Sequence, residues 1–316
     1  MGKITIYYKY FYVEDPHALA KWQRALCTEL GLNGRIIIAK EGINGTVGGD
    51  EKQVEIYKER MHAHPFFAGL DFKDSPGEAY HFPRLSIKIK DEIVHLGLDT
   101  EKIKATDSGK HLSPDEAHAF MAQEAEDVVV FDTRNTFEWK IGQFSKHAVN
   151  ADIEYFRELP EFIEKNSDLF KDKRVLMACT AGVRCERASA FLKSTGIAKE
   201  VYQFDGGIHK YAEKYPDGFF RGKNYVFDGR VAVKINDDVV GTCEMCGTAY
   251  DDHINCINAE CNKQILACEP CQQKYGTTCS ERCATLVKEG KVNIRTKPQR
   301  VLPPTANDDS KKHSSE

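Results

Sequence analysis

Two short apolar runs constrain the fold of this chain most strongly, DVVVFD at 127–132 and RVLMAC at 174–179. A strand that is apolar at almost every position is buried on both faces, which is typical of parallel strands in an α/β sheet. A third run, EVYQF at 200–204, follows, and helical patterns at 153–166 and 186–195 lie between the three. Functional loops of such sheets lie at the carboxyl ends of the strands. The sequence therefore predicts a parallel α/β domain with its functional residues directly after these runs.

The loop after the second run places a cysteine between a strand and a helix. Cys179 ends the strand, Gly182 allows a tight turn, and CERASAFLKSTG at 185–196 has the pattern of a helix that ends at Gly196. Inward-pointing backbone N–H groups and the positive end of the helix dipole favour a thiolate here, and Arg184 adds a fixed positive charge. We therefore expect the pKa of Cys179 to lie below its ordinary value of about 8.5.

Residues 1–98 have the pattern of a separate, smaller α+β domain. A run of strand formers comes first, and a helix begins after Asp15 and ends at Gly31. Two apolar runs on either side of Glu41 and Gly42 suggest a hairpin, and a second helix with further strands follows. The order β-α-β-β-α-β is that of a ferredoxin-like, or acylphosphatase-like, fold.

The segments outside these two domains indicate that the chain has several parts. Its overall fold class is predicted to be α/β. Residues 99–112 are polar and aperiodic, and Ser113, Pro114 and Glu116 then give the start signals of a helix. The segment 286–300 carries five basic residues against one acidic, and a polar stretch typical of disorder follows it. The expected boundaries are a ferredoxin-like domain at 1–98, a linker with this helix at 99–123, the parallel α/β domain at 124–220, a cysteine-rich module at 221–285, and a basic segment with a disordered tail at 286–316.

Eight of the eleven cysteines lie close together near the C-terminus. Such clustering in a chain without a secretory signal indicates metal binding or redox chemistry more than structural disulfides. Four pairs, each with two to four residues between its members, suit two tetrahedral zinc sites of four thiolates each. Which pairs share a site stays open, His253 could replace one cysteine, and iron–sulfur ligation or a metal-free cysteine knot are the alternatives. The eight are Cys243, Cys246, Cys256, Cys261, Cys268, Cys271, Cys279 and Cys283.

Three motifs of the central domain resemble those of rhodanese-type sulfurtransferases. CTAGVR at 179–184 is similar to their active-site loop, FDTRNTFEWKIGQF at 131–144 to their Asp-x-Arg segment, and QFDGGIHKY at 203–211 to their closing Gly-Gly motif. Gln143 stands where rhodaneses usually have His. The related dual-specificity phosphatases have a longer loop, with seven residues from Cys through Arg. The six residues here suit a persulfide sulfur or another compact group better than a phosphate.

The whole chain resembles the bacterial rhodanese-related tRNA uridine hydroxylases over about residues 1–285. Besides the rhodanese motifs, AKEGINGT at 39–46 and the cysteine-rich tail carry this resemblance. The family loop usually reads Cys-Thr-Gly-Gly-Ile-Arg-Cys, and this chain departs from it at Ala181 and Val183. The resemblance implies formation of 5-hydroxyuridine at wobble position 34 of tRNA, with molecular oxygen as co-substrate and the anticodon arm as the bound part of the RNA.

We assign expected roles to five residues of the loop and the neighbouring sheet edge. We expect Cys179 to be the catalytic residue, as a thiolate that can carry a persulfide or oxidised sulfur, and Arg184 to hold the loop and stabilise negative charge. Cys185 is either a resolving thiol for Cys179 or a small core residue. Asp132 and Arg134 either support the site or are structural, with the carboxylate capping a turn and the arginine pairing with Glu138.

Composition and remaining motifs narrow the alternatives. No run approaches the ~18 apolar residues of a membrane span, and no flavin, haem or nucleotide fingerprint is present, so we expect a cytoplasmic protein without an obligate protein partner. The net charge of −4 does not by itself indicate nucleic-acid binding. Two rival functions are transfer of sulfane sulfur through a Cys179 persulfide, and an RNA-binding adaptor with a vestigial rhodanese domain; retention of both Cys179 and Arg184 argues against the adaptor.

Overall fold

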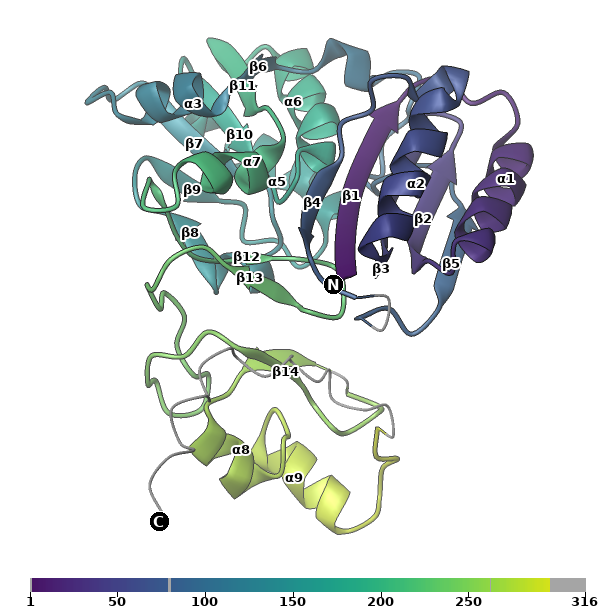
Figure 1. Cartoon of the computed structure of the whole chain (residues 1–316). Helices are drawn as coiled ribbons and strands as arrows, with labels where there is room; N and C mark the ends of the chain where they lie inside the picture. The colour runs from purple at the N-terminus through teal and green to yellow at the C-terminus, as the bar shows by residue number, and fades with distance from the viewer. Residues whose placement is uncertain (1, 79–80, 262, 296–316) are drawn as a thin grey trace, which may run out of the picture.

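The structure, a computed structural model, describes residues 2–78, 81–261 and 263–295. Figure 1 shows two α/β parts side by side, with a smaller C-terminal module below them. Within the described ranges, no helix combines the length and the apolar character needed to cross a membrane.

The N-terminal part is a five-stranded sheet with two helices on one face (Figure 1). Its strand order is β4-β1-β3-β2-β5, which is the predicted ferredoxin-like arrangement with one added strand, β5, parallel to β2. Asp15 begins the first helix as expected, because its carboxylate accepts hydrogen bonds from the N–H groups of His17 and Ala18. The elements are β1 (Gly2–Tyr10), α1 (Pro16–Glu29), β2 (Asn33–Ala39), β3 (Gly42–Asp50), α2 (Glu51–Ala63), β4 (Lys73–Pro76) and β5 (Leu85–Ile89).

The central part is built on a five-stranded parallel sheet, as predicted. Its strand order is β6-β11-β10-β7-β9, and the three apolar runs form its middle strands, β7 (Val128–Asp132), β10 (Arg174–Ala178) and β11 (Glu200–Phe204). One core packs α5 and α6 against the sheet, and a second core packs α3 and α7. The other elements are β6 (Lys110–Leu112), α3 (Pro114–Met121), α4 (Thr136–Trp139), β8 (Gly142–Phe144), β9 (Ala148–Asn150), α5 (Leu159–Lys165), α6 (Val183–Thr195), α7 (Gly207–Lys214), β12 (Phe220–Tyr225) and β13 (Ala232–Lys234).

The polar segment before α3 contributes a strand that its pattern did not predict. Its last three residues form β6, which pairs in parallel with β11. Because β6 is an edge strand with Lys110 and His111 exposed, it lacks the apolar signature of a central strand. Two helices also begin at other residues than expected: α5 starts only at Leu159, and α6 starts earlier, at Val183.

A buried ion pair joins the two α/β parts. Arg187, which is fully buried on α6, donates to Glu41 at 2.9 Å and to Glu92 at 3.3 Å, and it also donates to the carbonyl of Leu98 at 2.8 Å. Loss of one partner from such a pair leaves an uncompensated buried charge, which costs about 3–5 kcal/mol. This interaction therefore fixes the N-terminal sheet against the helix that follows the Cys179 loop.

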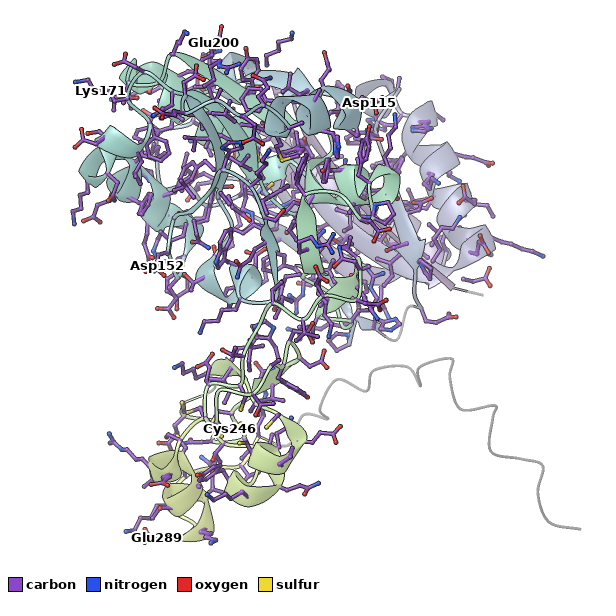
Figure 2. The ribbon with its side chains drawn as sticks, turned by 90° about the vertical axis from the view of Figure 1, so that its left-hand side faces the viewer. Asp115, Asp152, Lys171, Glu200, Cys246 and Glu289 are labelled. Carbon is purple, nitrogen blue, oxygen red and sulfur yellow. The ribbon has the colours of Figure 1, made fainter. Side chains whose placement is uncertain are left out.

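The C-terminal module contains little regular structure. Its elements are β14 (His253–Asn255), β15 (Gln264–Leu266), α8 (Glu269–Tyr275) and α9 (Glu281–Lys288). In Figure 2, Cys246 lies on the side of the module nearer the rest of the protein, and Glu289 lies at its far end. The predicted basic segment begins within α9 and turns back, since the N–H of Arg295 donates to the carbonyl of Ile257. The rest of that segment and the predicted disordered tail, 296–316, lie outside the described residues.

Candidate active site and cysteine groups

The Cys179 loop connects the central strand β10 to α6. Gly182 begins the helix with a φ of 102°, a conformation that strongly favours glycine, and its N–H donates to the Cys179 sulfur at 3.2 Å. The start of α7 holds the loop from the other side, because the N–H groups of Ile208 and His209 donate to the carbonyls of Cys179 and Thr180. The Gly-Gly motif at 206–207 permits this approach: a Cβ on residue 207 would lie only 2.6 Å from the Cys179 oxygen.

The environment of Cys179 stabilises its thiolate. Burial raises the pKa of this thiol, but a hydrogen bond from Cys185, the charge of Arg184 and backbone N–H groups outweigh burial and lower the pKa to about 6. Burial and the neighbouring thiolate raise the pKa of Cys185 well above its ordinary value. The two sulfurs therefore form an unequal pair, with a thiolate at Cys179 and a protonated thiol at Cys185. The expected direction of the Cys179 shift is confirmed.

Arg184 forms an ion pair with a carboxylate of its own domain. Its two terminal nitrogens donate to the Glu138 oxygens at 2.6 and 2.8 Å, and one of them also donates to Thr180 at 3.1 Å. Burial raises the pKa of Glu138, but the guanidinium beside it outweighs burial and keeps the carboxyl ionised. Glu138 was not among the expected site residues, and only its place in the Asp-x-Arg segment could have suggested it. The arginine thus holds the loop by an ion pair, and its charge acts on both Glu138 and Cys179.

Asp132 and Arg134 lie at the same edge of the sheet but bind each other. The Arg134 guanidinium donates to both Asp132 oxygens and to the carbonyl of Gly142, and both side chains are fully buried. The expected pairing of Arg134 with Glu138 is wrong, because Glu138 accepts from Arg184 instead. The arrangement joins the end of β7 to β8 and gives neither residue a hydrogen bond to Cys179 in the described structure.

Two tyrosines of the N-terminal domain cover the loop. Tyr8 donates to Glu186 on α6 at 3.0 Å, and Tyr10 donates to the carbonyl of Val183 at 3.1 Å. Tyr7, which points the opposite way, is buried in the N-terminal core. Cys179 is fully buried. The sequence signal for this contact is a strand with tyrosines on both faces, since such a strand needs a partner on each side.

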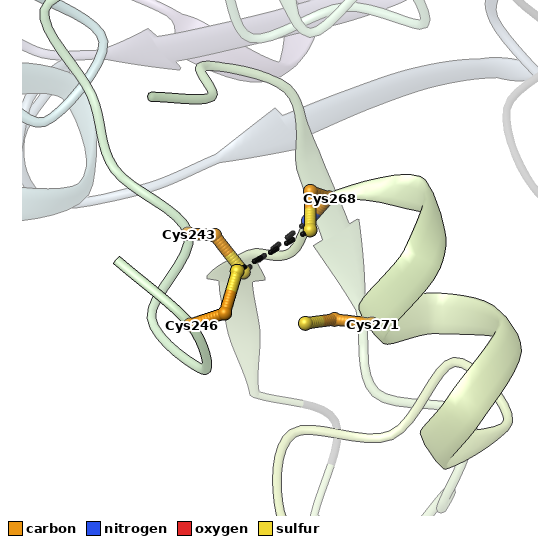
Figure 3. Close-up of side chains that lie close together, drawn as sticks. All are labelled: Cys243, Cys246, Cys268 and Cys271. Atoms are coloured by element: carbon orange, nitrogen blue, oxygen red, sulfur yellow. Dashed lines mark hydrogen bonds between the residues drawn. The ribbon is translucent and has the colours of Figure 1, made fainter. Parts of the chain in front are cut away.

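The eight clustered cysteines form two groups of four. Cys243, Cys246, Cys268 and Cys271 make the first (Figure 3), and Cys256, Cys261, Cys279 and Cys283 make the second; in each group all four sulfurs lie within 4.8 Å of one another. The pairs are therefore interleaved along the chain, an arrangement that the spacing had left open. All eight cysteines are free thiols.

His253 belongs to neither group. Its ring contacts Phe137 and Tyr225 at centroid distances of 6.5 and 5.7 Å, and burial lowers its pKa to about 4. The expectation that it could replace one cysteine is therefore wrong, because each described group already has four sulfurs of its own.

Comparison with known proteins shows to which family this chain belongs. Family profiles match a UPF0176 acylphosphatase-like domain at 2–93, a rhodanese-like domain at 113–214 and a rhodanese C-terminal region at 221–284. The chain is also 43% identical to the tRNA uridine(34) hydroxylase of Corynebacterium urealyticum, over 89% of this chain and 96% of that protein. The chain belongs to the tRNA uridine(34) hydroxylase family. Members from Cytophaga hutchinsonii and Shouchella clausii are 45% and 41% identical to this chain. Each match spans 89% of this chain, and the two matches span 89% and 88% of those proteins, respectively.

The unequal thiol pair predicts a pH-dependent absorbance. We expect the ultraviolet thiolate signal that the Cys179→Ala variant lacks to appear with a midpoint near pH 6 as pH rises. Cys185→Ala removes the side-chain interaction that lowers the pKa of Cys179 most, so the midpoint should move upward. Cys27→Ala, which removes a buried thiol of the N-terminal domain, should leave the midpoint unchanged. A midpoint at or above the ordinary value of about 8.5 would contradict this description of the loop.

Proposed function

We propose that this protein hydroxylates C5 of uridine 34 in tRNA, with molecular oxygen as co-substrate and Cys179 as the reacting thiol. The observation that carries the proposal is the sequence identity of 41–45% to relatives named tRNA uridine(34) hydroxylase over about nine-tenths of the chain. A loop that stabilises a buried thiolate supports Cys179 as the residue concerned. Since tRNA is the substrate, we expect the protein to act in the cytoplasm.

Each loop residue has a distinct role in this proposal. The Cys179 thiolate is the reactive group, and Arg184 keeps it ionised through its charge. Glu138 positions Arg184, because it accepts from both terminal nitrogens of the guanidinium. Asp132 and Arg134 form a buried ion pair that stabilises the sheet edge from which the loop begins.

Cys185 serves as the resolving thiol. Hydroxylation places one oxygen atom of O₂ in the C5–H bond, and the other leaves as water after it takes two electrons and two protons. Two thiols that join in a disulfide supply that number of each. The overall step therefore consumes uridine, O₂ and the Cys179–Cys185 dithiol, and it yields 5-hydroxyuridine, water and a disulfide that cellular thiols reduce. The hydrogen bond between the two side chains supports this pairing.

Two zinc ions would bind the cysteine groups. A tetrahedral site with Zn–S distances of about 2.3 Å keeps its sulfurs about 3.8 Å apart. Sulfur–sulfur distances of 3.6 Å between Cys246 and Cys268, and of 3.5 Å between Cys261 and Cys279, are close to that value and far from the roughly 2.05 Å of a disulfide. Zinc would supply folding energy to a module with few apolar residues. Folded in this way, the module and its basic segment would contact the anticodon arm, mainly at phosphates.

Nucleoside mass spectrometry of cellular tRNA tests the function. In a strain without this protein and without other sources of the modification, we expect 5-hydroxyuridine and its derivatives to be absent and the wild-type gene to restore them. Cys179→Ala should stay at the level of the deletion strain, and Cys27→Ala should match the wild type. Persistence of the nucleoside in the deletion strain would refute the hydroxylase function. Full rescue by Cys179→Ala would refute its catalytic role, and high thiosulfate:cyanide activity with no effect on tRNA would favour sulfur transfer.

Elemental analysis of double variants tests the zinc sites and their interleaved pairing. The wild type should contain two zinc ions per chain, in accordance with the two groups. Cys243→Ser with Cys268→Ser damages one group only, so one zinc should remain. Cys243→Ser with Cys256→Ser damages both groups, so neither ion should be held tightly. Equal metal content in the two double variants would contradict the interleaved pairing, and iron in place of zinc would contradict the choice of metal.

A further inference from the structure

Phe227 is an exposed aromatic side chain beside the Cys179 loop. It is 46% exposed, whereas phenylalanine in this chain is otherwise often buried, and its ring lies 5.6 Å from the Arg184 guanidinium carbon. About half of the ring surface is therefore open to solvent next to the reactive loop, where a ligand can contact it.

The chain holds this ring in place from two sides. Tyr225 and Phe137 contact it at centroid distances of 5.1 and 6.4 Å, both in edge-to-face geometry. The backbone after it forms a tight turn, because the N–H of Val226 donates to the carbonyl of Val231 and the Asp228 carboxylate accepts from Arg230. The ring is therefore exposed on a rigid support rather than on a loose loop.

The loop reaches solvent close to this ring. Cys179 itself is fully buried, but Thr180 and Arg184 each keep about 7% of their surface exposed. The Thr180 hydroxyl lies 3.3 Å from the carbonyl oxygen of Tyr225, and Arg184 lies beside Phe227, so both residues border the turn that carries the ring. Phe227 therefore lies at the surface next to these two loop residues.

We propose that Phe227 is the stacking platform for a nucleobase of the anticodon loop, a role that rests on the proposed function. Enzymes that act on a base take it out of its stack, which costs free energy that a new stacking partner offsets. Proteins bind unpaired RNA bases by stacking them on aromatic side chains, and each such contact contributes about 1–3 kcal/mol. Phe227 has the required π-face at the edge of the reactive loop, and it carries no group that hydrogen-bonds a particular base. It is thus a positioning residue that holds the RNA while the Cys179 loop modifies the uridine.

Variants of Phe227 test this role against matched variants of Phe66. Phe66 is 50% exposed and also contacts other rings, but it lies in the short 3-10 helix Pro65–Phe67 of the N-terminal domain. With purified protein and an anticodon stem-loop RNA, Phe227→Leu should weaken binding and raise KM by about 5- to 150-fold. Phe227→Trp and Phe227→Tyr should keep near wild-type values, and Phe66→Leu should change little. Thermal unfolding of each variant checks that the fold is intact.

Fluorescence gives a readout that a purely structural role would not change. In Phe227→Trp the new indole should be quenched when the RNA binds, beyond any change in the wild type, and Phe66→Trp should show no added quenching. The proposal is overturned if Phe227→Leu binds RNA as the wild type does, if Phe66→Leu loses as much, or if the indole at 227 does not respond. If the wild type binds RNA but forms no 5-hydroxyuridine, the proposed function fails, while quenching at 227 still decides whether this ring stacks on RNA.

Discussion

The buried ion pair between Arg184 and Glu138 is the interaction on which the candidate site depends. It joins the first turn of α6 to the short helix after β7, and Thr180 completes it with hydrogen bonds to both partners. Loss of either charged partner would leave the other buried and uncompensated, at a cost of about 3–5 kcal/mol. Because the guanidinium is held so firmly, its charge is available to Cys179 without any rearrangement, and the thiolate is stabilised before substrate arrives.

One helix connects this site to the rest of the molecule. Arg184 and Arg187 lie one turn apart on α6, and the first pairs within its own domain while the second pairs with Glu41 and Glu92 across the domain interface. That interface places Tyr8 and Tyr10 over the loop. The N-terminal domain therefore covers one side of the loop that holds the thiol pair.

Features that depend on local sequence were predictable, and features that depend on distant contacts were not. Strand β10, the turn at Gly182 and the low pKa of Cys179 follow from residues within a few positions of one another. The four cysteine pairs were visible for the same reason, but the interleaved grouping depends on how the chain returns between the pairs. The pairing of Glu138 with Arg184, across 46 positions, and the contact of Tyr8 with α6 are set by the sheet and the domain interface. The sequence did not predict the polar edge strand β6, because an edge strand needs no apolar pattern.

In the proposed function, the Cys179 loop places an atom of molecular oxygen on uridine. The most direct measurement incubates the purified protein with unmodified tRNA under oxygen-18 gas and analyses both the nucleosides and the protein by mass spectrometry. We expect 5-hydroxyuridine with one labelled oxygen, together with a peptide in which Cys179 and Cys185 are joined by a disulfide. Unlabelled 5-hydroxyuridine, or labelled product formed equally well by Cys179→Ala, would contradict it.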